Sequence, residues 1–114
     1  MVQYVSTDDL DETFSALADA TRRGIVECLG RGDASISELA SSFDMTLTGV
    51  KKHVRILEEV GLVRTEKVGR VRRCTLGPRR LDHEATWIAE YRAVLEERLD
   101  HLERLLEHAQ TSSP

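Results

Sequence analysis

Four side chains whose chemistry suits contact with DNA recur at helical spacing in the middle of the chain. They are Thr48, Lys51, Lys52 and Arg55. Positions three and four apart share one side of a helix, so a helix here would present all four together. Hydroxyl, ammonium and guanidinium groups bind phosphates and base edges. On an isolated helix such a face is more often simply solvated, so the surrounding elements must decide between the two interpretations.

These residues fall in the second of two short helices that we expect within residues 35–60. A capping box of Ser35 and Glu38 marks the start of the first helix. Its apolar face is Ile36, Leu39, Ala40 and Phe43. Thr46 is the N-cap candidate of the second helix. The face that the second helix turns to the core is predicted to be Leu47, Val50, Val54 and Leu57.

Two helices joined by a three- or four-residue turn form a helix-turn-helix. In that motif the start of the second helix contacts bases, which favours DNA binding over a solvated face. Gly49 leaves the helix surface bare near this end. The candidate DNA contacts of the motif are therefore Thr46, Thr48, Gly49, Lys51, Lys52, His53 and Arg55.

A β-hairpin is predicted after the motif, over residues 62–76. Several β-branched residues supply the strands and Gly69 marks the turn. Charge can protect an edge strand from aggregation. Because the charges here flank the turn, we favour a wing that binds phosphate or enters the minor groove. Its candidate DNA contacts are Lys67, Arg70, Arg72 and Arg73.

Two further helices are expected before the motif. The first should carry one apolar face of Leu10, Phe14, Leu17 and Ala18. The second should begin after Asp19 as its N-cap and end at the glycines Gly30 and Gly32. Near its start, Arg22 and Arg23 are interpreted as solvated side chains rather than as phosphate contacts.

A long helix is predicted at residues 81–109. Its apolar residues recur in alternating steps of four and three, interrupted at Arg92, which is the pattern of a coiled-coil seam. This apolar surface is too large for one small domain to cover. We therefore expect a homodimer interface formed with the first helix through Leu10, Phe14, Ile88, Tyr91, Leu95, Leu99, Leu102 and Leu106. The alternatives are a helix lying across its own domain, and a protein-interaction module that uses the long helix.

The charge of the chain is unevenly distributed. The 114 residues carry a net charge of −4, which by itself argues against nucleic acid. Residues 46–76, however, hold eight Lys or Arg against three Glu, whereas residues 81–109 hold three Arg against eight acids. Basic charge is thus concentrated on the predicted motif and wing, as a DNA-binding surface requires.

Taken together, these residues resemble the arsenic-repressor (ArsR) family of winged helix-turn-helix transcription regulators. The resemblance rests on ALADATRRGIVECL, ISELA, TGVKKHVRILEEVGLV and the hairpin, and covers roughly residues 10–80. It implies one mainly α domain over residues 1–114, with a small β-hairpin and a C-terminal dimerisation helix. It also implies a repressor that binds a two-fold related operator. Many members carry Ser where Lys51 stands, which bears on base preference rather than on fold.

Other chemistry is not indicated by the sequence. Serines 41 and 42 stand where metal-sensing relatives carry paired cysteines, and His101 and His108 lack the spacing of the family's other metal site. We therefore expect no metal, no cofactor and no catalytic centre. The effector is unknown, and the alternatives are no effector or an unidentified organic ligand or partner. Cys74, among arginines, is the better of two redox candidates, as a thiol of lowered pKa. No signal peptide or apolar run of membrane length occurs, so we expect a cytoplasmic protein.

Overall fold

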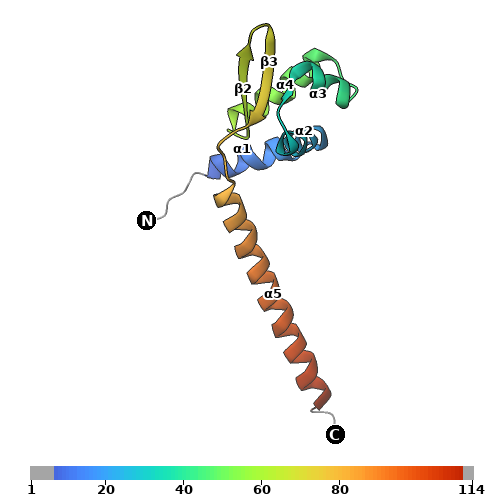
Figure 1. The fold of residues 1–114 in the computed structure, drawn as a ribbon. Coiled ribbons are helices and arrows are strands. Elements are labelled where there is room, and N and C mark those ends of the chain that lie inside the picture. The colour runs from blue at the N-terminus through green and yellow to red at the C-terminus, as the bar shows by residue number, and fades with distance from the viewer. Residues whose placement is uncertain (1–6, 112–114) are drawn as a thin grey trace. The chain divides into compact units, whose positions relative to one another are not determined.

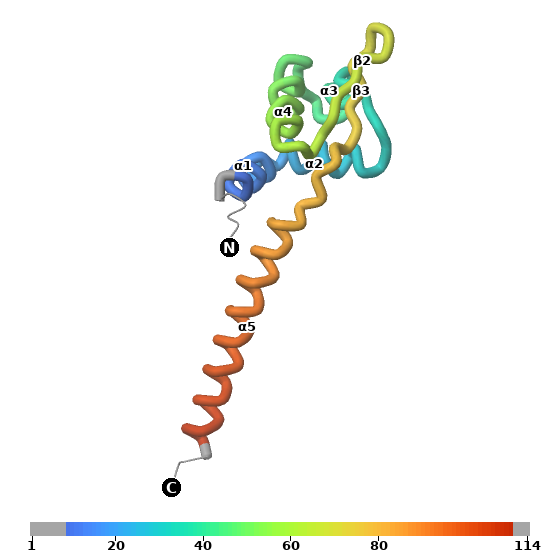
Figure 2. Tube along the Cα trace, turned by 90° about the vertical axis from the view of Figure 1, so that its left-hand side faces the viewer, coloured from blue at the N-terminus to red at the C-terminus, as the bar shows by residue number. Residues whose placement is uncertain are grey.

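The computed structural model describes residues 7–111, which fall into two compact units divided between Arg80 and Leu81. The first unit contains helices and a hairpin, which are labelled in Figure 1 and Figure 2, and also a short strand. In order they are α1 (Thr7–Leu17), α2 (Ala20–Arg31), β1 (Ala34–Ser35), α3 (Ile36–Ser42), α4 (Leu47–Glu59), β2 (Val63–Val68) and β3 (Val71–Leu76). The second unit is the single helix α5 (Asp82–Thr111). The mainly helical class with a small antiparallel hairpin is confirmed.

Side-chain caps fix the starts of α2, α3 and α4 as predicted. The carboxylate of Asp19 accepts the Arg22 N–H at 3.0 Å at the start of α2. Ser35 and Glu38 form the reciprocal capping box of α3. The predicted end of α2 at its two glycines is confirmed, because the helix ends at Arg31 and Gly32 is its C-cap.

The sheet has one strand that the sequence did not predict. Its order is β1-β3-β2, all antiparallel, with Ala34 opposite Cys74 and Ser35 opposite Arg73. The two-residue strand β1 directly precedes α3. Its pairing with β3 therefore connects the start of the helix-turn-helix to the hairpin. At the far end of the hairpin, Gly69 has a φ of 66° and makes the tight turn between β2 and β3.

The core of the first unit lies between α2, α3, α4 and the sheet. Its most buried side chains include Ile25, Leu29, Leu39, Val50, Val54, Leu57, Val63 and Cys74. The ring of Phe43 packs on Gly24, where a Cβ would meet Cε1 at 2.7 Å. Leu47 was predicted in this core and is instead 48% exposed. It is the first residue of α4 and lines a surface hollow with Lys67 and Arg70.

Helix α1 turns toward the core a face other than the apolar face predicted to carry Leu10 and Phe14. Its buried residues are Thr13 and Ala16, whereas Phe14 is 36% exposed and Leu10 is half-buried. The small residues of α1 thus face the core. The larger apolar residues are left partly accessible to solvent, as an interface with another chain would require.

Helix α5 exposes every residue from 85 to 110. The accessible apolar side chains include Ile88, Leu95, Leu99, Leu102 and Leu106. Trp87 and Tyr91, one turn apart, stack with ring centroids 5.8 Å apart. None of the helices between residues 7 and 111 combines the length and apolar character needed to span a membrane.

Candidate nucleic-acid interface

The start of α4 presents the polar face that the sequence predicted. The hydroxyl of Thr46 accepts the Gly49 N–H at 3.0 Å and so caps the helix. Val50, Val54 and Leu57 are buried and fix the opposite side of the helix against the core. The side chains left exposed along α4 include Thr48, Lys51, Lys52 and Arg55.

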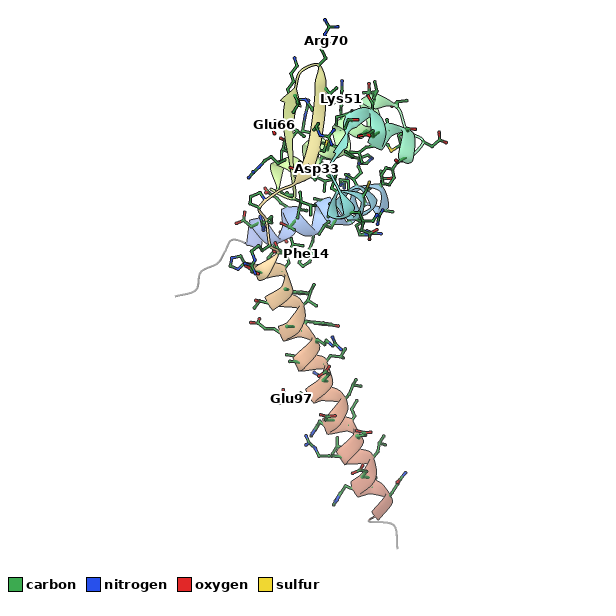
Figure 3. All side chains as sticks on the ribbon, viewed as in Figure 1. Phe14, Asp33, Lys51, Glu66, Arg70 and Glu97 are labelled. Atoms are coloured by element: carbon green, nitrogen blue, oxygen red, sulfur yellow. The ribbon has the colours of Figure 1, made fainter. Side chains whose placement is uncertain are left out.

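The hairpin register divides the basic residues of the wing between two faces. Val63 and Cys74 are buried and mark the face toward the core. Lys67 pairs with Arg72, and because side chains alternate along a strand, both lie on this same face. Arg70 occupies the turn and points away from the helices (Figure 3).

Arg73 lies on the other face of the hairpin, apart from Lys67 and Arg72. It pairs across the strands with Glu66, and its neighbour in β1 is Ser35. The backbone N–H of Ser35 lowers the pKa of Glu38, and the positive charge of Arg73 contributes to the same shift. Arg73 therefore does not join the basic surface that contains Arg72.

A groove between α4 and the wing brings the predicted basic residues together. One part, of about 360 Å³, is lined by Lys51 and Arg55 of α4 and by Arg72 of β3. An adjoining hollow of about 300 Å³ is lined by Lys51, Lys67, Arg70 and Arg72. Figure 3 shows Lys51 on the side of α4 nearest the hairpin. Cations from α4 and from the wing thus form one surface, which we call the basic groove.

His53 is directed to α2 rather than into the basic groove. Its Nδ1 lies 3.2 Å from Arg22 Nη1 and 3.9 Å from the carboxylate of Asp19. The backbone N–H of Arg22 is the main cause that lowers the pKa of Asp19, so this carboxylate stays ionised beside Arg22 and His53. His53 thus links α4 to the start of α2.

Arg22 is not the solvated side chain that the sequence suggested, whereas Arg23 is exposed but also makes a hydrogen bond to the backbone. Arg22 donates from Nε to the carbonyl of Ala16 at 2.6 Å and from Nη2 to that of Ser15 at 3.2 Å. Arg23 donates to the carbonyl of Leu17 at 2.7 Å. The last carbonyls of a helix have no partner within the helix, so these bonds cap the end of α1.

Two groove residues were missed by the sequence reasoning. Glu58 lines the basic groove, and its Oε2 accepts bonds from the hydroxyl and the N–H of Thr65. A signal was present, because Glu58 follows Lys51 by seven positions and Arg55 by three and so falls on the same stripe of α4. The position of Thr65 in the groove can be recognised only once the hairpin register is known.

The prediction that Cys74 has a lowered pKa is wrong. Its side chain is fully buried, and burial raises the pKa of the thiol to about 11, with the charge of Glu58 adding to the shift. The nearby arginines oppose this effect but do not outweigh it. Within residues 7–111, no group of three or more His, Cys, Asp or Glu side chains is arranged to hold a metal ion.

The capped helix pair followed by a basic hairpin defines a winged helix-turn-helix. A family model described as a helix-turn-helix domain matches residues 17–66. The crystal structure of an ArsR family transcriptional regulator is 43% identical, with a TM-score of 0.73, over 84% of this chain and 97% of that one. The chain therefore belongs to the ArsR family of transcriptional regulators.

Two further similar proteins differ in what they support. The HTH-type transcriptional regulator Rv2034 of Mycobacterium tuberculosis is 37% identical over 60% of this chain and 64% of its own length. A homodimeric winged helix-turn-helix DNA-binding domain from Mycobacterium bovis is 22% identical. Its TM-score is 0.63, over 89% of this chain and 93% of that one, and at this identity it supports the fold alone.

Proposed function

We propose that this chain is a homodimeric transcriptional repressor that binds a two-fold related operator through α4 and the wing. The observation that carries the proposal is the basic groove, in which Lys51, Arg55 and Arg72 line one surface. The proposed DNA contacts are Thr46, Thr48, Gly49, Lys51, Lys52, Arg55, Lys67, Arg70 and Arg72. His53 and Arg73 are proposed to act by supporting this surface, since their charged or polar atoms lie beside α2 and β1.

The homodimer is proposed to form through α5. Its leucines are about half exposed over much of the helix length, and a coiled-coil partner would cover them. Phe14 and Leu10 on α1 are also accessible and are proposed to contribute. Two winged helices related by a two-fold axis would read two half-sites about one turn of DNA apart. The related domain from Mycobacterium bovis is itself homodimeric.

A pair of arginine substitutions tests the proposed DNA contact. Arg72 and Arg64 are both exposed on the hairpin, but Arg64 pairs with Thr75 and lies on the face away from the groove. We expect Arg72→Ala to weaken binding on all sequences and to reduce the salt slope by about one per subunit. Arg64→Ala removes the same charge and should change the affinity little.

Fluorescence anisotropy with DNA from upstream of the gene would measure both variants. Equal losses from Arg72→Ala and Arg64→Ala would show that general charge, not the basic groove, drives binding. If neither the parent nor the variants bound DNA, the alternative of a protein-interaction module centred on α5 would be favoured instead.

A further inference from the structure

A hydrogen-bond relay joins the end of α4 to the wing inside the basic groove. The hydroxyl of Thr65 donates to Glu58 Oε2 at 2.8 Å, and the backbone N–H of Thr65 donates to the same oxygen at 3.3 Å. The hydroxyl oxygen also accepts a bond from Arg72 Nη1 at 3.1 Å. The relay therefore runs from Glu58 on α4 through Thr65 on β2 to Arg72 on β3.

The charge of Glu58 is opposite to what a DNA-binding groove is expected to contain. It lines the groove together with Lys51, Arg55 and Arg72. A carboxylate on such a surface repels phosphate, so its removal alone should tighten DNA binding. The bonds of Glu58 to Thr65 imply the opposite effect, because they hold the hairpin against α4 and fix the direction of Arg72.

We propose that Glu58 and Thr65 are positioning residues, which hold the Arg72 guanidinium beside Lys51 and Arg55 for contact with phosphate. This inference rests on the proposed function of the groove. A long side chain that is ordered before binding loses less conformational entropy on binding. This gain offsets the repulsion between Glu58 and phosphate. Loss of the relay should weaken DNA binding about two- to tenfold, the effect of one hydrogen bond.

The sign of the effect of Glu58→Ala separates positioning from simple repulsion. Glu59 is the matched control, because it is an exposed acid next to Glu58 that lies outside the relay. We expect Glu58→Ala to weaken DNA binding, and Glu59→Ala to leave it unchanged or slightly tighter. Tighter binding by Glu58→Ala would overturn the proposal. Circular dichroism of each variant would establish that it is folded at the assay temperature.

A double-mutant cycle tests whether Thr65 acts through Arg72. Thr65→Val removes the hydroxyl but keeps the size and the backbone N–H, whereas Thr65→Ser keeps the hydroxyl. We expect Thr65→Val to weaken DNA binding, Thr65→Ser to retain it, and Thr65→Val to have no further effect in an Arg72→Ala background. If the losses of affinity from Thr65→Val and Arg72→Ala were additive, the relay would be refuted but the DNA contact of Arg72 would stand. An unchanged affinity of Arg72→Ala would instead refute the proposed DNA contact, and the relay with it.

Discussion

The two compact units of this chain distribute apolar and charged side chains in opposite ways. The first unit buries its apolar residues, among them Ile25, Leu39 and Leu57, and exposes cations on α4 and the wing. Helix α5 carries a regular apolar row, yet Leu95, Leu99 and Leu102 are 46%, 54% and 52% exposed. Helices in proteins are stabilised chiefly by packing of their apolar face. The helices of the first unit are packed in this way against one another and the sheet. The apolar row of α5 is not packed within its own unit.

This difference indicates that the two units have different kinds of partner. A surface of fixed cations over a finished core suits a polyanion, because binding requires charge and pre-ordered side chains. An exposed row of leucines suits another apolar helix, because burial of that row releases water. We therefore propose DNA as the partner of the first unit and a second copy of the chain as the partner of α5.

The largest effect is expected from a charge placed in the apolar row of α5. Leu99→Asp would bury an unpaired carboxylate in the proposed interface, so the dimer should dissociate at micromolar concentration. His101→Asp adds the same side chain two residues away, outside the row, and should remain dimeric. Sedimentation velocity would measure both. A dimeric Leu99→Asp variant would show that the interface lies elsewhere, and the contrast between the units would fail.

The reactivity of the two thiols tests whether the core of the first unit is closed to solvent. With a pKa of about 11, Cys74 has only about one thiol in a thousand ionised at pH 8. It is also fully buried, whereas Cys28 is half-buried. We expect iodoacetamide to modify Cys28 at least about a hundredfold faster than Cys74 in the native protein, since the thiolate is the reactive form.

Peptide mass spectrometry over time would measure the two rates, and denaturant should bring them together. Because the raised pKa delays ionisation, the rate at Cys74 should rise with pH up to about 11. Similar native rates at pH 8 would mean that the core around Cys74 opens readily.

The smallest effect is expected at the N-cap of α4. Thr46→Ala removes the acceptor of the Gly49 N–H, so the free energy of unfolding should fall by about 1 kcal/mol. Thr48→Ala is the control, because Thr48 is exposed on the same turn and does not cap the helix. Urea unfolding would measure both variants. Equal stability of the two would indicate that the start of α4 is not fixed before DNA binding.

Local features of the fold could be predicted from the sequence. The caps by Ser35 and Thr46 connect residues three apart, so residue types alone predict them. The turn at Gly69 likewise follows from neighbouring residues. The basic residues of α4 could be grouped because they recur at the period of a helix, and those of the wing because they flank the turn at Gly69.

Features that depend on contacts between distant elements could not be predicted. The strand β1 forms only because Ala34 reaches Cys74, forty residues later in the sequence. The caps that Arg22 provides to α1 depend on the angle at which two helices meet. The wrong prediction for the pKa of Cys74 has the same origin. Its arginine neighbours in the sequence suggested a lowered pKa, but its burial, which depends on tertiary contacts, raises the pKa.

The salt dependence of DNA binding tests the central claim most directly. In the proposed complex about six phosphate contacts per subunit would each release counterions. They would come from Lys51, Lys52, Arg55, Lys67, Arg70 and Arg72. Affinity for the upstream DNA should therefore fall by a factor on the order of a thousand or more between about 50 and 200 mM salt. The logarithm of the binding constant should fall linearly with the logarithm of the salt concentration. A flat response would contradict the assignment of the basic groove to DNA.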